Sequence, residues 1–363
     1  MNIMARTKQL EMHPEKTCFL IMGKKEQNIK VEEQIMKNPI LFGDFETKKR
    51  KNEKYLGNKL SEDGLGKSVE HTIKLRKGRI SAAIYEIRGI IQDYRMQSIG
   101  GILAAVDLYE LAIIPALLNN SESWTSITES ALTTLEELQN MFLRLILKVP
   151  ISTPKLALKW EFGMIGMKFR VMIRKLTFLN SIKHQDDGSL AKQVLMEQLS
   201  HGWPGLAKES EDFCQYLGIK NINSNEIKIS KWKNTVKSAA KEKCKNEMRT
   251  EMKSGSKLKH LAGEEFQLKE YIKEKSIEDV RMNFKVQTKM LDFKMNFKSS
   301  PTYSRELWRC DSCQTGAIES QSHVLHCPAY KKLREGKNLG NDKDIVEYFR
   351  KVLQIRENLD LLK

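Results

Sequence analysis

The sequence predicts a mainly α-helical protein with a small α+β piece at its N-terminal end and a small cysteine-rich module at its C-terminal end. Three observations lead to this fold class. Apolar residues recur every three or four positions from about residue 67 to 184, which is typical of helices packed through one face. Short apolar runs bounded by glycine and charged residues precede residue 65 and favour strands. Three cysteines and two histidines lie close together between residues 310 and 327.

The stretch 1–65 is predicted to be the α+β piece. The apolar run 17–23 (TCFLIMG) favours a buried strand, and a second strand is expected from Lys54 to a turn at 61–64 (SEDG). Between them lies the basic run KKRK at 48–51, which is either a nuclear import signal or a charged loop between strands. A piece this small does not make a complete domain, so we expect a further segment in front of it.

The stretch 66–184 is predicted to be a bundle of four helices. The first helix begins near Lys67, where six apolar residues share one face. These residues are Val69, Ile73, Ile80, Ile84, Ile87 and Ile91. The second helix covers 102–118 and must kink or end at Pro115, because proline lacks the amide donor. The third covers 129–148, and the fourth follows Gly163.

The stretch 185–300 is predicted to be a basic helical connector, and 301–363 a small module that ends in a helix over 344–357. The connector follows a polar loop at 184–188 and has a weaker apolar pattern. Between residues 228 and 260, eleven Lys and Arg stand against three Glu, a local charge of +8, with Trp232 as the only Phe, Tyr or Trp.

The net charge of the 363-residue chain is +16, with a pI near 9.4, which favours a polyanionic partner. RNA, DNA or a hybrid duplex is the first candidate. We expect five lysines of the connector to contact its phosphates: Lys228, Lys231, Lys233, Lys237 and Lys241. The alternative is a solvated helical face. Four aromatic residues further on either stack on bases or belong to the core: Phe284, Phe293, Phe297 and Trp308.

No apolar run approaches 18 residues, and the opening MNIMARTKQLEMHPEK has no apolar signal core. We therefore expect an intracellular protein of the nucleus or cytoplasm, without a membrane partner. Six cysteines in so long a chain do not make a disulfide framework. Cys18, Cys214 and Cys244 are isolated in the sequence and are expected to be reduced thiols.

Four residues near the C-terminal end have the spacing of a zinc site. Cys310 and Cys313 form a Cys-x-x-Cys turn, and His323 and Cys327 are four residues apart, which puts them on one face of a helix. Four such ligands close a tetrahedron and leave no position for water, so the zinc would be structural, in a segment with little core of its own. His326 is an alternative to His323 as ligand, and the competing interpretation is a loop without metal.

The order of these features resembles the C-terminal part of a non-LTR (LINE-type) retrotransposon reverse transcriptase, just after its catalytic aspartate motif. Residues 10–23 resemble the palm motif in which a lysine precedes a strand, and 54–64 resembles the primer-grip turn. Residues 108–124 and the helix ending at Pro150 are similar to the thumb, and the cysteine cluster followed by Pro328, Tyr330 and Arg334 resembles the zinc knuckle behind it. The resemblance covers nearly the whole chain.

The resemblance implies roles for individual positions. Lys16 would be the general acid that protonates pyrophosphate, whereas without the family it is a solvated lysine after a turn. Tyr55, Leu56 and Gly57 would form the primer grip, although Tyr55 taken alone is more often a core residue. The helices of 66–184 would lie along the template and primer as a thumb-like bundle.

One departure concerns catalysis. The family's RNA-directed DNA polymerase activity needs clustered aspartates that hold Mg²⁺, and that motif would lie before Met1. Mg²⁺ is therefore expected only if a complete palm is present. Asp186-Asp187 is the only adjacent aspartate pair and is expected in a polar loop. Nine residues separate Cys313 from His323, which is longer than the retroviral spacing, and the residues after Cys327 are too few for an endonuclease.

Three functions are therefore weighed. The first is a nucleic-acid-binding fragment or remnant of a reverse transcriptase, without polymerase activity on its own. The second is a zinc-containing helical adaptor that binds proteins. The third is an active polymerase. The basic connector favours the first, because neutralising phosphates needs many cations and little sequence precision.

Overall fold

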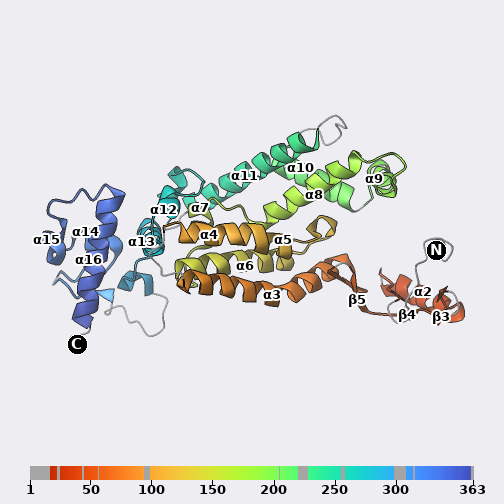
Figure 1. The fold of residues 1–363 in the computed structure, drawn as a ribbon, viewed down its shortest axis with the longest axis horizontal. Helices are drawn as coiled ribbons and strands as arrows, with labels where there is room; N and C mark the ends of the chain where they lie inside the picture. Colours follow the sequence, from red (N-terminus) through yellow and green to blue (C-terminus); the bar gives the residue numbers. More distant parts are fainter. Residues whose placement is uncertain are drawn as a thin grey trace. The chain divides into compact units, whose positions relative to one another are not determined.

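Helices account for 67% and strands for 7% of the computed structural model, so the predicted fold class, mainly α with a small strand-containing N-terminal piece, is confirmed (Figure 1). The structure describes residues 17–22, 25–42, 45–55, 57–93, 99–203, 205–219, 228–254, 258–297, 308–313 and 315–360. Within these ranges, no helix is both long enough and apolar enough to cross a membrane. None of the six cysteines forms a disulfide.

The chain folds into two compact units, each assembled from three separate stretches. The first unit comprises Met1–Ile84, Glu110–Gln139 and Ile165–Cys244, and the second comprises Tyr85–Tyr109, Asn140–Met164 and Lys245–Lys363. Three helices contribute residues to both units: α3 (Leu65–Asp93), α6 (Glu129–Leu147) and α11 (Ile229–Lys253). The predicted boundaries at 65, 184 and 300 stay a prediction.

The first unit begins with one helix and short strand pairs. The elements are β1 (Cys18–Phe19), α2 (Lys25–Lys37), β2 (Leu41–Phe42), β3 (Phe45–Glu46) and β4 (Lys48–Lys49). Strand β1 pairs in parallel with β4, while β2 and β3 form an antiparallel pair. The basic run 48–51 is therefore partly strand rather than only a charged loop. Lys49 in this run forms ion pairs with Glu32 and, at 3.2 Å, with Glu62.

The segment expected as one strand from Lys54 is instead an antiparallel hairpin of β5 (Asn52–Tyr55) and β6 (Asn58–Ser61). The chain reverses at Gly57, whose φ of 82° lies in the left-handed region that favours glycine. The sequence prediction missed this reversal because it placed the turn only at 61–64. Gly64, with a φ of 104°, does make a second turn there, before α3 begins.

The helices predicted for the stretch 66–184 are present. Helix α3 buries the six residues predicted for its apolar face, each at most 6% exposed. The further helical elements of this stretch that belong wholly or partly to the first unit are α5 (Ile114–Leu117), a 3₁₀ turn η2 (Ser121–Ser123), α6 and α8 (Met167–Lys183). The basic connector contains more helices than the sequence predicted, with α9 (Leu190–His201) and α10 (Leu206–Leu217) ahead of α11. Trp232 anchors α11 to α8, because its buried Nε1 donates to the Leu176 carbonyl at 2.8 Å.

The predicted break at Pro115 takes the form of a π-helical turn. Helix α4 (Gly101–Leu108) passes into the π turn η1 (Tyr109–Ile113), and the α-helical pattern resumes in α5 with Pro115 in its first turn. Proline fits there because its missing N–H and fixed φ suit the start of a helix.

The second unit is helical and contains the C-terminal module. Its remaining elements are α7 (Lys155–Glu161), η3 (Leu261–Gly263), α12 (Glu270–Glu274), α13 (Ile277–Gln287), η4 (Lys294–Phe297), α14 (Gln321–His326), η6 (Pro328–Tyr330), α15 (Lys331–Arg334) and α16 (Asp342–Asp360). Tyr109 and Phe142, both fully buried, stack with ring centroids 4.1 Å apart. Arg281 fastens α13 to the end of α6, because its Nε donates to the Ile146 carbonyl at 2.9 Å.

Candidate metal centre and basic surfaces

The first two ligands of the predicted zinc site lie on a tight turn, as expected. Arg309 and Ile318 form an isolated antiparallel bridge, and the Cys310 amide donates to the Ala317 carbonyl at 2.9 Å. Gly316 adopts a φ of 68° on the returning side of the turn. The bridge closes the loop that carries Cys310 and Cys313 and so fixes the start and the end of the Cys-x-x-Cys turn.

The other two ligands lie at the end of α14. The Ser320 hydroxyl caps this helix by accepting from the His323 amide at 3.0 Å. Cys327 was predicted to share a helix face with His323, and this is wrong. It is instead the C-terminal cap of α14, with φ −58° and ψ 127°. The physical reason is Pro328, since the residue before a proline is disfavoured in the α conformation.

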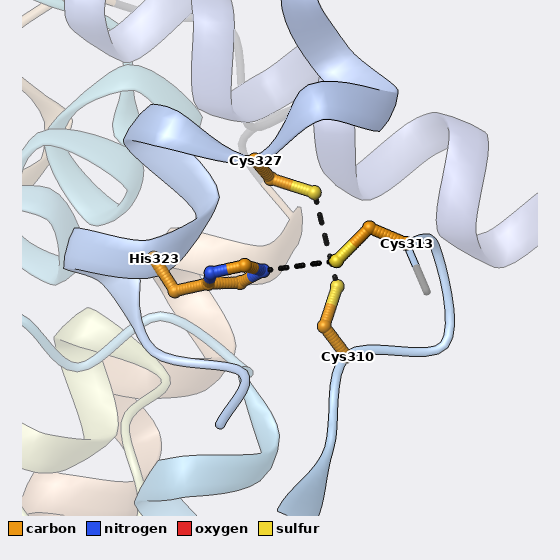
Figure 2. Close-up of side chains that lie close together, drawn as sticks. All are labelled: Cys310, Cys313, His323 and Cys327. Carbon is orange, nitrogen blue, oxygen red and sulfur yellow. Dashed lines mark hydrogen bonds between the residues drawn. The ribbon is translucent and has the colours of Figure 1, made fainter. Parts of the chain in front are cut away.

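The four side chains converge on one point (Figure 2). Their ligand atoms all lie within 4.8 Å of one another. The Sγ atoms of Cys310 and Cys327 are 3.9 Å apart, and Cys313 Sγ is 3.4 Å from His323 Nε2. Ligands placed about 2.3 Å from a central ion at tetrahedral angles would be roughly 3.8 Å apart. The four residues can therefore hold a metal ion with little rearrangement.

Burial makes the thiols differ in acidity. It raises the pKa of Cys327 to about 12 and also raises the pKa of Cys310. The Thr315 hydroxyl, 3.0 Å from Cys313 Sγ, lowers the pKa of that more exposed thiol to about 6. Metal ions bind thiolates, so binding at this site must displace the protons of the two buried thiols.

Hydrogen bonds from neighbouring side chains hold the segments that carry the four residues of the cluster. Arg334 Nη1 donates to the Cys327 carbonyl at 2.8 Å, and the buried Tyr348 hydroxyl donates to the Val324 carbonyl at 2.6 Å. The hydroxyls of Ser312 and Tyr330 are 2.6 Å apart, which links the Cys-x-x-Cys turn to η6. Tyr330 and Arg334 are two residues that carried the resemblance to the zinc knuckle.

The expectation that this segment has little core of its own is wrong. Cys310 and Cys327 belong to a cluster of eleven buried residues that extends across position 300 and includes side chains of α13 and α16. The fully buried members include Leu291, Phe293, Tyr348, Phe349 and Val352. The sequence did not reveal this core because α13 and α16 are more than 50 residues apart in the chain.

Glu319 and His326, the other polar residues near the cluster, are not part of it. Glu319 is buried and pairs with Arg356 at 3.0 Å, and its carboxylate also accepts from the Lys294 amide at 3.2 Å. His326 is exposed. Glu319 therefore braces the fold, and His323 is the histidine that the geometry assigns to the cluster.

The predicted basic surface lies on α11 and the residue before it. The buried side of this helix is a row of every fourth residue: Trp232, Val236, Ala240, Cys244, Met248 and Met252. The five predicted lysines are all exposed: Lys228, Lys231, Lys233, Lys237 and Lys241. Three of them, Lys233, Lys237 and Lys241, form a second row beside the buried one, because residues four apart share a helix face. None of the five forms a side-chain ion pair or hydrogen bond with another described residue.

Two of the predicted primer-grip residues, Tyr55 and Gly57, lie at the tip of the β5–β6 hairpin. Tyr55 is 63% exposed and is not a core residue, and Lys54 beside it is exposed as well. Gly57 is in the turn. Leu56 and Lys16 lie outside the residues that the structure describes, so the general-acid role of Lys16 stays a prediction.

Two of the aromatic residues considered for base stacking belong to the core. Phe284 and Phe293 are fully buried. The aspartate pair Asp186-Asp187 lies in the loop between α8 and α9, as expected, where the Asp187 side chain is 97% exposed and pairs with Lys192 at 2.7 Å. An aspartate in this setting does not contribute to a buried metal cluster.

Known family models, curated proteins and solved structures yield no match to this chain.

Several supporting residues had no signal in the sequence. Arg76, Arg356 and Glu161 make their main contacts with residues 18 to 110 positions away. A lone charged residue on a helix is usually solvated, so only a structure distinguishes these from their neighbours.

Proposed function

We propose that this chain binds nucleic acid and corresponds to the palm-edge, thumb and zinc-knuckle portion of a non-LTR retrotransposon reverse transcriptase. The observation that carries the binding function is the exposed lysine surface of α11. Lys231, Lys233, Lys237 and Lys241 are held on a helix that Trp232 anchors, and none of these four has a carboxylate partner among the described residues. Unpaired cations in a fixed row favour a polyanion, because each phosphate contact releases bound counterions.

The spacing of the row supports a strand-like polyanion over a single compact anion. Consecutive members of Lys233, Lys237 and Lys241 are separated by about 6 Å along the helix axis, given the rise of 1.5 Å per residue. The three ammonium groups thus cover about 12 Å, which suits a chain of phosphates. Hydroxyl and amide side chains lie on the neighbouring side of α11, where Ser230, Asn234 and Ser238 line a shallow hollow with Lys231. Such groups commonly donate to phosphate oxygens.

The tip of the β5–β6 hairpin is proposed as a second contact. Tyr55 supplies an exposed aromatic ring at the tip, and Lys51 and Lys54, which precede it in the chain, are exposed as well. An aromatic ring among cations can stack on a base while the cations bind the adjoining phosphates. This assignment agrees with the primer-grip role that the family resemblance implies.

The Cys310, Cys313, His323 and Cys327 cluster is proposed to hold a structural zinc ion. Three thiolates and one imidazole are ligands that Zn²⁺ prefers, and four protein ligands leave no coordination position for water or substrate. Because Cys310 and Cys327 are also core residues, bound zinc would fasten the turn and α14 to the module's core.

Polymerase activity is not proposed for this chain alone. Nucleotidyl transfer requires carboxylates that hold two metal ions. Among the described residues, the one group of three or more potential ligands is the cysteine cluster. The Asp186-Asp187 pair lies in a solvated loop.

The test is a fluorescence-anisotropy titration of a labelled RNA–DNA hybrid with the zinc-loaded full chain at several salt concentrations. With five lysines in contact, log K should fall with log salt with a slope of roughly −4. The triple variant of Lys233, Lys237 and Lys241 to Ala should reduce the magnitude of that slope by about 3. A matched triple variant of the exposed lysines Lys259, Lys332 and Lys343 removes the same charge and should leave the slope nearly unchanged.

A helical adaptor that binds proteins is the second candidate. It is favoured by an apolar hollow of about 270 Å³ in the second unit, lined chiefly by isoleucine and leucine side chains of α3, α4 and α13. Absence of binding at low salt, or binding that does not respond to salt, would reject the nucleic-acid function and leave the adaptor as the better account.

A further inference from the structure

The free edge of strand β6 is covered by side chains of helix α3. The Ser61 amide donates to Ser68 Oγ at 2.9 Å, and the Lys59 amide donates to Thr72 Oγ1 at 2.7 Å. Next along the edge, the Gly57 carbonyl accepts from Arg76 Nη2 at 2.9 Å. These groups take the place that the backbone of a third strand would have.

The contacts repeat because the distance between successive bonded residues along the strand nearly equals the distance between their partners along α3. Along β6 the bonded residues are two apart, a distance of about 6.7 Å. Along α3 the partners are four apart, a rise of about 6 Å. The hairpin can therefore follow the helix for three successive contacts, and its direction is set by α3.

Arg76 makes the last and most extensive of these contacts. In addition to Gly57, its guanidinium donates to Asn58 Oδ1 at 3.1 Å, and to the carbonyls of Leu117 and Asn119 at 3.0 and 2.7 Å. The guanidinium also lies 5.6 Å from the centre of the Trp124 ring. Trp124 Nε1 in turn lies 3.3 Å from Asn58 Oδ1 and donates to it. One side chain thus joins the tip of the hairpin to the segment after α5.

We infer that Arg76 is a positioning residue that fixes the tip of the hairpin, and with it Tyr55, for contact with nucleic acid. The inference rests on the proposed function. The Arg76 guanidinium donates to Gly57 and Asn58, and Asn58 is the cross-strand partner of Tyr55 in the hairpin. Arg76 therefore holds the residues directly opposite the exposed ring. Fixing the tip before binding removes an ordering cost from association.

The experiment is a double-mutant cycle on the zinc-loaded full chain, read by anisotropy with the same RNA–DNA hybrid. Tyr55→Ala should weaken binding roughly tenfold, the effect of losing one stacked base. Arg76→Gln should weaken it by a similar factor. Arg79→Gln is the matched control, because Arg79 is an exposed arginine on the same helix and its side chain has no partner among the described residues. It should weaken binding no more than about twofold, as expected for one distant charge.

The decisive result is the coupling between Arg76 and Tyr55. In the Tyr55→Ala background, Arg76→Gln should weaken binding of the hybrid no more than Arg79→Gln does. Amide hydrogen exchange at residues 52–61 should be faster in the Arg76→Gln variant but not in the Arg79→Gln variant. The inference would be overturned if Arg76→Gln reduced the affinity for the hybrid as much in the Tyr55→Ala background as in the wild type. It would also be overturned if the two arginine variants lost equal affinity in the wild-type background. If Arg76→Gln does not fold, Asn58→Ala tests the same coupling by removing the acceptor that Arg76 and Trp124 share.

The proposed function fails separately from this inference. A wild-type chain that does not bind the hybrid rejects the function itself. A wild-type chain that binds, with Tyr55→Ala binding equally well, rejects the hairpin contact and the role of Arg76 but leaves the lysine row of α11 in place.

Discussion

Replacing Glu161 by Gln should make the protein more stable at alkaline pH and change its stability much less at pH 5. Glu161 ends helix α7 and is 1% exposed. Its Oε2 accepts from the Tyr271 hydroxyl at 2.7 Å, while Oε1 is buried and has no hydrogen-bond partner among the described residues. Burial is the largest influence and raises the pKa of this carboxyl from 4.5 to about 7.

The direction in which stability changes with pH follows from the folded and unfolded pKa values of Glu161. The unfolded chain releases the proton near pH 4.5 and the folded chain near pH 7, so between these values the folded state binds more protons. The stability that Glu161 contributes is therefore complete below about pH 4.5 and is lost as the pH rises to about 7. A difference of about 2.5 in pKa corresponds to about 3 kcal/mol of unfolding free energy. Among the nearby charges, Lys269 opposes this shift, whereas Glu264 and Asp342 reinforce it.

The assay is urea unfolding of wild type and Glu161→Gln at pH 5, 6, 7 and 8 with zinc held constant. The variant should exceed the wild type by no more than about 1 kcal/mol at pH 5, where the unfolded carboxyl has begun to ionise, and by about 3 kcal/mol at pH 8, apart from the small cost of replacing the acid. Taking the difference between the two proteins removes the contribution of every other titrating group. Tyr271→Phe, which deletes the hydroxyl that favours the ionised carboxylate, should extend the loss of stability to higher pH and enlarge it. A stability difference that stays constant from pH 5 to 8 would refute the reasoning.

Two further outcomes are expected. Metal analysis of the purified chain should find about one zinc per molecule, lost in Cys310→Ser and kept in His326→Ala, since His326 is exposed and outside the cluster. A metal-free chain with a folded second unit would contradict the zinc proposal. Primer extension on an RNA template with Mg²⁺ should yield no product from this chain alone, and any metal-dependent product would show that its carboxylates suffice for nucleotidyl transfer.

The sequence predicted the elements whose signal is local. Helix α3 was predictable because its buried residues are large and aliphatic at regular spacing, from Val69 to Ile91. The cluster of Cys310, Cys313, His323 and Cys327 was predictable for a similar reason, since its four residues lie within 18 positions and each is a residue type with few other uses in that pattern.

Other elements were hidden because small or polar residues occupy their buried positions. Helix α10 buries Ala207, Ser210, Cys214 and Leu217, of which only Leu217 is a large apolar residue. The hairpin at 52–61 was read as one strand because its turn contains a single glycine and no asparagine or aspartate before it. Cys327 was placed on a helix because the spacing from His323 was considered without the effect of Pro328.

The matching steps of β6 and α3 also constrain how this protein can change in length. One residue inserted into α3 between Thr72 and Arg76 would rotate the guanidinium by about 100° around the helix, away from Gly57 and Asn58. One residue inserted into β6 would turn its bonded edge toward β5. Insertions and deletions within 57–76 should therefore be tolerated only in the connecting turn near Gly64, which lies outside the repeated contacts, and related chains should share one length on either side of it.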